Sequence, residues 1–162
     1  MNPKTPAESL TRIAQVMQIS DANTNGFVHG GSIMRLVDTA AGVASMRHSQ
    51  RRVVTAQVDS LSFHAPVHVG DVLSLTACVT QAWNSSLEVE VTVHREDPVT
   101  GEQDHTTTAY LTMIGLDADG RPVAVPRVTP ETDEDHRRRR AAEARRKARI
   151  QLRKKLEKQQ TL

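Results

Sequence analysis

The sequence contains one apolar segment with helical periodicity, surrounded by segments whose pattern is typical of β-strands. In residues 30–48 the apolar side chains recur at helical spacing, at Ile33, Val37, Ala40, Ala41 and Ala44. Residues 87–94 instead alternate between apolar and polar side chains, as a half-buried antiparallel strand does. A single helix in such a chain must bury its apolar stripe against the sheet. We therefore predict an α+β fold in which one antiparallel sheet wraps around one central helix.

The expected order of elements is strand, helix and four strands. The five strand segments are residues 10–19, 53–63, 72–82, 87–94 and 106–116. Short turns rich in Pro, Gly and Asp join the last four of them, which favours antiparallel pairing. Residues 20–28 are predicted to form a loop before the helix, whose N-cap is expected to be Ser32 or Gly31.

The C-terminal segment differs from the rest of the chain in charge. Residues 131–162 hold 12 Lys+Arg and 6 Asp+Glu, whereas residues 1–130 hold 9 and 13. The formal net charge of +2 therefore combines a tail of +6 with a body of −4. We predict a main domain over residues 1–125, followed over residues 126–162 by a proline-containing linker and a basic helix.

That C-terminal helix is expected to begin at a cap formed by Thr129 or Thr132. Its predicted apolar stripe is thin and consists of Ala141, Ala144, Ala148, Leu152 and Leu156. So narrow a stripe does not hold a lone helix in water. The helix should dock on its own chain or on a neighbouring subunit, or else fray.

Composition excludes several classes of protein. Aromatic residues make up 2% of the chain, and the body is acidic, so we expect no nucleic-acid partner. No apolar run approaches the length of about 18 residues that a membrane helix needs, and we expect no membrane partner. One cysteine and no secretory signal at the N-terminus predict a cytoplasmic protein without a disulfide framework.

Metal and nucleophile chemistry are also disfavoured. His64 and His68 have a metal-like spacing, but Pro66 between them indicates a turn, and no third ligand is near in the sequence. There is no Gly-x-Ser-x-Gly motif, and Cys78 lies in the middle of a predicted strand. We therefore predict no metal site and no redox or metal cofactor.

Two features of the helical segment point to a functional site. Gly30 and Gly31 open the helix, where unpaired N–H groups can polarise a carbonyl. Asp38 has Met34, Ala41 and Gly42 as helical neighbours, so we expect it in an apolar stripe where a carboxylate is costly unless paired. It is either a functional group or a structural carboxylate bonded to nearby backbone. Roughly 10 Å separates the two features along a helix, so a second chain would have to bring its own Asp38 close.

A longer set of residues resembles a known family. Asp21-Ala22-Asn23, Gly26, Val28-His29-Gly30-Gly31 and Asp38 resemble the brain-type, or cytosolic, acyl-CoA thioester hydrolases, and the order of elements is similar to the hotdog fold. The resemblance covers residues 10–157, with further matches at Val53-Val54-Thr55-Ala56, Pro66-Val67, Gly70-Asp71, Ser85-Ser86-Leu87 and Val125-Pro126. It implies hydrolysis of acyl-CoA to a free acid and CoA, by a homo-oligomer that is a dimer or a trimer of dimers.

The resemblance also implies roles for individual residues. Asn23 of one chain and Asp38 of its partner would face one thioester at a dimer interface. Asp38 would be general base or nucleophile, Asn23 would orient the water or the thioester, and the Gly30 and Gly31 amides would hold the carbonyl oxygen. The CoA channel would be lined by Thr55, Asn84, Ser85 and Ser86. Its phosphates would meet Arg51 and Arg52, or Arg137 and Arg138 of the tail.

Three other functions remain open from the sequence. A non-catalytic acyl-CoA sensor would bind the same ligand without hydrolysing it. A hotdog dehydratase or hydratase would need an acid beside a histidine, and no second acid stands near His29. A nucleic-acid module built on the tail would bind with steep salt dependence, lost on removal of residues 136–162.

Overall fold

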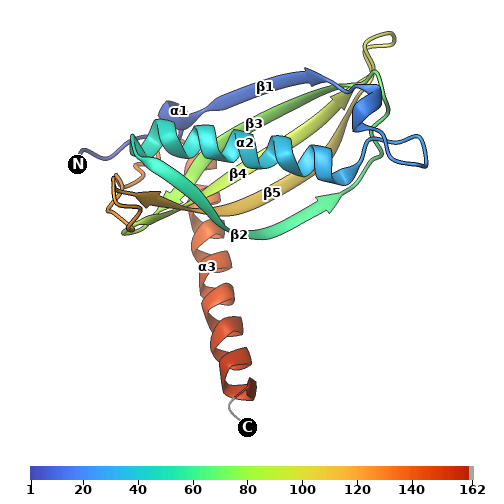
Figure 1. Cartoon of the computed structure of the whole chain (residues 1–162). Coiled ribbons are helices and arrows are strands. Elements are labelled where there is room, and N and C mark those ends of the chain that lie inside the picture. The colour runs from blue at the N-terminus through green and yellow to red at the C-terminus, as the bar shows by residue number, and fades with distance from the viewer. Residues whose placement is uncertain (161–162) are drawn as a thin grey trace.

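One long helix lies along the inner face of a curved five-stranded sheet (Figure 1). The computed structural model describes residues 1–160. The helix is α2 (Gly30–Ser49), and the sheet is antiparallel throughout, with strand order β1-β3-β4-β5-β2. The strands are β1 (Thr11–Val16), β2 (Arg52–Phe63), β3 (Val72–Ala82), β4 (Ser86–Glu96) and β5 (Gln103–Leu116). The predicted α+β fold with a central helix is confirmed.

The core lies between α2 and the inner face of the sheet. The alternation predicted for β3 and β4 holds, because the side chains that face α2 are fully buried: Leu73, Leu75, Ala77, Val79, Leu87, Val89, Val91 and Val93. They pack on a stripe of α2 that includes Ile33, Leu36, Val37, Ala40, Ala41 and Ala44. The small side chains in that stripe let the helix approach the sheet closely.

The first strand is shorter than its apolar pattern suggested. β1 ends at Val16, before a turn of 3-10 helix, Ile19–Asp21, whereas the predicted strand ran from residue 10 to residue 19. The chain leaves the sheet at Met17, whose backbone N–H donates to Asp71 O and whose side chain is buried. A short helix, α1 (Pro6–Ser9), precedes β1 and packs near the C-terminal end of α2.

Strand β2 forms an open edge of the sheet. Within residues 1–160 it pairs with β5 alone, with two irregularities in register, between Thr55 and Gln57 and between Val58 and Ser60. Its apolar side chains Val54 and Val58 are 46% and 43% exposed. An edge strand with exposed apolar side chains is a template for pairing with another chain.

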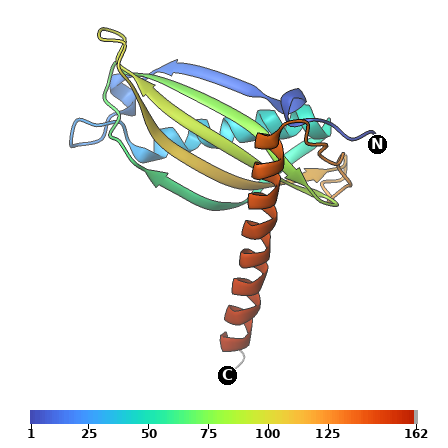
Figure 2. The same ribbon diagram turned by 180° about the vertical axis from the view of Figure 1, so that it is seen from behind.

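The C-terminal helix α3 (Asp133–Gln160) crosses the outer face of the sheet (Figure 2). Over the sheet the predicted apolar stripe is wrong, since Ala144 and Ala148 are exposed. The side chains turned to the sheet are Arg138, Ala142, Arg145 and Arg149. The reason is electrostatic, because the outer face of the sheet presents acidic residues and the arginines pair with them.

In the described part of the chain, three ion pairs join α3 to the sheet. Arg138 contacts Glu90 at 3.0 Å, and Arg149 pairs with Asp59. Arg145 makes two hydrogen bonds to Glu88, of 3.1 and 2.7 Å, and its guanidinium lies 3.6 Å from the centre of the Tyr110 ring. Glu88 was predicted on the polar face of its strand, yet it is fully buried beneath α3.

The start of α3 is fixed by its cap. The Thr132 hydroxyl accepts a hydrogen bond from the Asp135 N–H at 3.1 Å, and Asp135 Oδ2 accepts from the Thr132 N–H at 3.1 Å. This reciprocal pair is a capping box. The alternative cap, Thr129, is excluded because its backbone pairs with Lys4 instead. In residues 1–160, no helix combines the length and the apolar character that crossing a membrane would require.

His48 anchors the linker between β5 and α3. It is fully buried near the end of α2, and its Nε2 lies 2.9 Å from Pro126 O. Its Nδ1 is buried without a hydrogen-bond partner among residues 1–160. Burial lowers the pKa of His48 below its ordinary value of 6.5.

We expect Arg145→Ala to lower the free energy of unfolding by about 3 kcal/mol, because Glu88 would remain buried without its cation. Urea denaturation at pH 7 measures the change. Arg140→Ala, at an exposed position of the same helix, is the control and should leave the unfolding midpoint unchanged. An Arg145→Ala variant as stable as the control would contradict the role given to this pair.

Stability is also expected to depend on His48. Because its folded pKa is depressed, the unfolded chain takes up the proton first as the pH falls. The stability that the uncharged His48 side chain contributes is complete above about pH 6.5 and is lost progressively below it. The comparison is wild type with His48→Gln, by denaturation between pH 8 and pH 5. The variant should show a shallower decline below pH 6.5, and parallel curves would refute the assignment.

Candidate active site

Asp38 lies on the flank of α2 that faces the edge strand β2. The Thr55 hydroxyl, from β2, donates a hydrogen bond to Asp38 Oδ1 at 2.5 Å and also lies 3.5 Å from Met113 Sδ. The expectation of a buried carboxylate is wrong for the single chain, because Asp38 is exposed. The buried stripe of α2 passes on the other side of the helix, and Met34, one turn earlier, is exposed as well.

An apolar cavity opens beside Asp38. Its volume is about 450 Å³, and its walls come from α2, β2 and β5. It is lined by Gly31, Met34, Arg35, Val37, Asp38, Val58, Leu61 and Leu111. A mostly apolar cavity with one carboxylate at its rim fits a ligand that has an apolar chain and a reactive polar group.

Asn23 lies in the loop before α2 and does not line that cavity. Its side-chain Oδ1 accepts hydrogen bonds from the backbone N–H groups of Asn25, at 2.8 Å, and Phe27, at 3.3 Å. Gly26, with a φ of +82°, completes this tight turn. The side-chain NH₂ of Asn23 donates to no group within residues 1–160. The loop therefore fixes the amide oxygen and leaves the amide nitrogen free to donate.

The N-terminus of α2 is capped by His29. The predicted caps, Ser32 and Gly31, are wrong, because His29 Nδ1 accepts a hydrogen bond from the Gly31 N–H at 2.9 Å. The Gly31 amide, expected to be open to a ligand, is thus engaged by this imidazole. In the described part of the chain the Gly30 N–H donates no hydrogen bond and is open.

A side chain at Gly31 would require its neighbour to move, whereas one at Gly30 would make an ordinary contact. A Cβ on Gly31 would come within 3.0 Å of His29 Nδ1, and a Cβ on Gly30 would come within 3.4 Å of the Phe63 ring. Phe63 comes from the end of β2, so this strand supplies neighbours to both Asp38 and the N-terminus of α2.

The other predicted site residues lie at the end of the sheet away from Phe63 and Gly30. Asn84 and Ser85 form the turn between β3 and β4, where their carbonyls accept from Val125 N–H and Gly115 N–H. Ser86 begins β4 and Arg52 begins β2; their partners on β5 are Ile114 and Leu116. Thr55, which contacts Asp38, lies near this end as well, because its partner on β5, Met113, is adjacent to Ile114, the partner of Ser86.

The structure also shows the surroundings of two tail arginines and of Cys78. The tail arginines Arg137 and Arg138 pair with Glu134, within α3 itself. Burial raises the pKa of Cys78 to about 11, so its thiol stays protonated at neutral pH. Within residues 1–160 no three His, Cys, Asp or Glu side chains gather as a metal site would require.

Sequence reasoning missed three contacts at this site. It did not pair Thr55 with Asp38, it did not place Phe63 over Gly30, and it did not identify His29 as the cap. The first was accessible in part, because a threonine in an apolar strand segment is a candidate partner for an isolated carboxylate. The register irregularities of β2 hid which side Thr55 faces.

Comparison with known proteins places the chain in a family. A profile of the thioesterase superfamily matches residues 25–102. The uncharacterized acyl-CoA thioester hydrolase YkhA of Bacillus subtilis is 37% identical over 137 residues, covering 82% of this chain and 80% of YkhA. The chain belongs to the thioesterase superfamily. The rat cytosolic acyl coenzyme A thioester hydrolase is 34% identical over 138 residues; the match covers 84% of this chain but only about a third of that longer protein (36%).

Solved structures agree with this membership of the superfamily. A hexameric acyl-CoA thioesterase in its apo form has a TM-score of 0.90 and 35% identity, covering 93% of this chain and 97% of the other. An acyl-CoA hydrolase from Staphylococcus aureus, in complex with butyryl coenzyme A, coenzyme A and coenzyme A disulfide, has a TM-score of 0.88 and 33% identity, covering 98% and 96%.

The Staphylococcus aureus hydrolase has also been studied as three alanine variants. They replace an asparagine, an aspartate 15 residues after it, and a threonine 17 residues after the aspartate. Asn23, Asp38 and Thr55 have the same spacing in this superfamily member.

We expect His29→Ala to lower the free energy of unfolding by about 1 kcal/mol, the usual cost of losing an N-cap. His29→Asn, which keeps a side-chain acceptor, should retain most of that stability. Thermal and urea denaturation of the two variants measure the difference. Equal losses in both would show that the imidazole does not act as the cap.

Proposed function

We propose that this chain is an acyl-CoA thioesterase, which hydrolyses acyl-CoA to a free carboxylic acid and CoA. The observation that carries the proposal is the hydrogen bond from Thr55 to Asp38 at the rim of an apolar cavity. The spacing of Asn23, Asp38 and Thr55, shared with an acyl-CoA hydrolase that binds butyryl coenzyme A, supports it. The cavity would receive the acyl chain, and the carboxylate would lie at the thioester.

Asp38 is proposed to act on the attacking water. The Thr55 hydroxyl occupies Oδ1 and orients the carboxylate, so Oδ2 is left for a water molecule. As general base, Asp38 would take a proton from water while the water oxygen bonds to the thioester carbon. The C–S bond then breaks, and the CoA sulfur receives the proton. As nucleophile, Asp38 would instead bond to the carbonyl carbon while the C–S bond breaks and CoA leaves as a thiolate; water would then hydrolyse the resulting anhydride, freeing the acid and Asp38, and the thiolate would take up the proton released.

The carbonyl oxygen needs a donor where negative charge develops. The open Gly30 N–H at the positive end of α2 is suited to this, and the free amide nitrogen of Asn23 can donate to the water or the thioester. Gly31 could contribute only if His29 turned away from its N–H.

A dimer would bring these groups together. Within one chain Asn23 and Gly30 lie at the start of α2, and Asp38 lies about 12 Å further along it. Pairing of two open β2 edges about a two-fold axis would set the Asp38 of one protomer opposite the loop of the other. Each dimer would then hold two sites. Hexameric relatives support a homo-oligomer built from such dimers.

CoA itself would run from Thr55 toward the adjacent end of the sheet, away from Gly30. Asn84, Ser85 and Ser86 offer polar groups along that path. Exposed Arg52 borders a cavity of about 240 Å³ with Gln50, Arg51 and Asp117, where a CoA phosphate could be bound.

The first experiment is release of free thiol from acyl-CoAs of short to long chain, with wild type and Asp38→Asn. We expect wild-type hydrolysis and a fall in kcat of about 100-fold or more in the variant, the usual contribution of a general base. An unchanged kcat would remove Asp38 from the chemistry. Wild-type protein that binds acyl-CoA without releasing thiol would be a sensor and not an enzyme.

Mixing two inactive variants tests whether the site spans two chains. Heterodimers of Asn23→Ala and Asp38→Asn protomers would contain one intact site and one doubly altered site. Random mixing should restore about one quarter of wild-type activity. If Asn23 and Asp38 of the same chain formed each site, mixing would restore no activity.

A further inference from the structure

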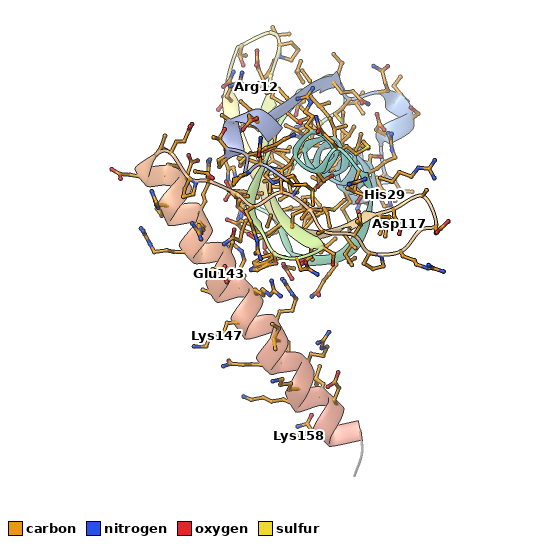
Figure 3. All side chains as sticks on the ribbon, turned by 90° about the vertical axis from the view of Figure 1, so that its left-hand side faces the viewer. Arg12, His29, Asp117, Glu143, Lys147 and Lys158 are labelled. Atoms are coloured by element: carbon orange, nitrogen blue, oxygen red, sulfur yellow. The ribbon has the colours of Figure 1, made fainter. Side chains whose placement is uncertain are left out.

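The C-terminal part of α3 extends beyond the sheet on which its first part is docked (Figure 1, Figure 3). The side chains turned toward the sheet follow alternating steps of four and three residues, at Arg138, Ala142, Arg145 and Arg149. The last of them pairs with Asp59 on β2, the open edge strand. The next two positions in this repeat are Leu152 and Leu156. The stripe that carries arginines over the sheet therefore carries leucines beyond its edge.

These two leucines are exposed in the single chain, at 59% and 49%. They line a groove of about 270 Å³ at the edge of β2, together with Gln57, Arg149, Ile150 and Arg153. A short, charged helical segment that projects into water with its apolar side chains uncovered has little to stabilise it. Their position on the docking stripe of α3 indicates that they pack against a surface.

We infer that the segment 151–159 of α3, called here the overhang, docks through Leu152 and Leu156 on a second copy of this chain. The overhang emerges at the edge where β2 lacks a neighbour, so a strand paired there would continue the sheet directly beneath it. Val54 is 46% exposed and lies on the side of β2 opposite to Thr55, which faces α2. Val54 of the second copy would therefore present an apolar side chain to the overhang on the outer face of the sheet.

Charge complementarity favours residues 1–130 of a second copy as the surface on which the overhang docks. The overhang holds four basic residues and one acidic residue, whereas residues 1–130 carry a net charge of −4. The first part of α3 already binds acidic residues on the outer face of its own sheet, at Glu90, Glu88 and Asp59. With two-fold symmetry each overhang would cover the other protomer. This inference rests on the proposed function in one respect, because both place a second copy of the chain at the β2 edge.

The test compares two double variants of the full chain by sedimentation velocity over a range of concentrations. In Leu152→Asp with Leu156→Asp, we expect the dissociation constant of the wild-type assembly to rise at least about 100-fold, because two buried leucines are lost from each protomer. Ala144→Asp with Ala148→Asp adds the same charge at exposed positions off the stripe and should leave the assembly unchanged. Circular dichroism shows whether both variants keep their helix content.

A second measurement does not depend on the variants assembling normally. A photoreactive benzophenone side chain at position 156 should cross-link to residues 52–63 or 103–116 of another copy. Mixed ¹⁴N- and ¹⁵N-labelled protein identifies such cross-links as intermolecular. The same group at position 148 should give none. Cross-links from position 156 within the same chain only would overturn the inference.

Activity separates this inference from the proposed function. If the leucine variant dissociates and loses thioesterase activity in parallel, both stand. If it dissociates but keeps full activity as a monomer, the docking inference stands and the shared active site fails. If it assembles as wild type does, the docking inference is overturned whatever its activity. Salt-dependent binding of an oligonucleotide, lost in the leucine variant with the assembly unchanged, would likewise overturn it and assign the overhang to nucleic acid.

Discussion

The burial of one narrow stripe of α2 against a curved sheet is the constraint on which the rest of the structure depends. Ala40, Ala41 and Ala44 let the helix approach the strands closely, and longer side chains such as Leu36 fill the remaining space. Because the stripe is narrow, it covers one side of the helix and leaves the flank toward β2 open. Asp38 and Met34 lie on that flank, so the packing that stabilises the core also determines where the carboxylate can act.

The open edge at β2 is the second consequence of that packing. Thr55 reaches Asp38 from this strand, Phe63 lies against Gly30 from its end, and Asp59 receives Arg149 of α3. The strand thus contributes to the proposed active site on its inner side and to the docking of α3 on its outer side. A partner that paired with this edge would complete both, which links assembly to activity in physical terms.

Arginine replaces the apolar residues that a docked helix usually presents. The outer face of β4 carries Glu88 and Glu90, and a helix of alanines would leave Glu88 buried without a cation. Arg145 supplies two parallel hydrogen bonds and a contact with the face of Tyr110, which gives α3 a defined register on the sheet. Such pairs favour a specific geometry more than they add stability. This explains why hydropathy alone identified the wrong face of α3 where it covers the sheet.

The sequence by itself determined the five strands, the two long helices, the α+β class and the central position of α2, because the periods of apolar residues directly encode which faces are buried. It also singled out Gly30, for the unpaired amides of a helix start, and Asp38, a carboxylate among apolar helical neighbours, whereas Asn23, an ordinary loop residue, was identified through the resemblance of its motif to a family. Only the tertiary structure decided that Thr55 holds Asp38, that His29 occupies the Gly31 amide and that Glu88 is buried under Arg145. Each of these contacts joins different elements or depends on the rotation of a side chain. Strand register, with its irregularities in β2, and helix docking set them, and neither is encoded in local periodicity.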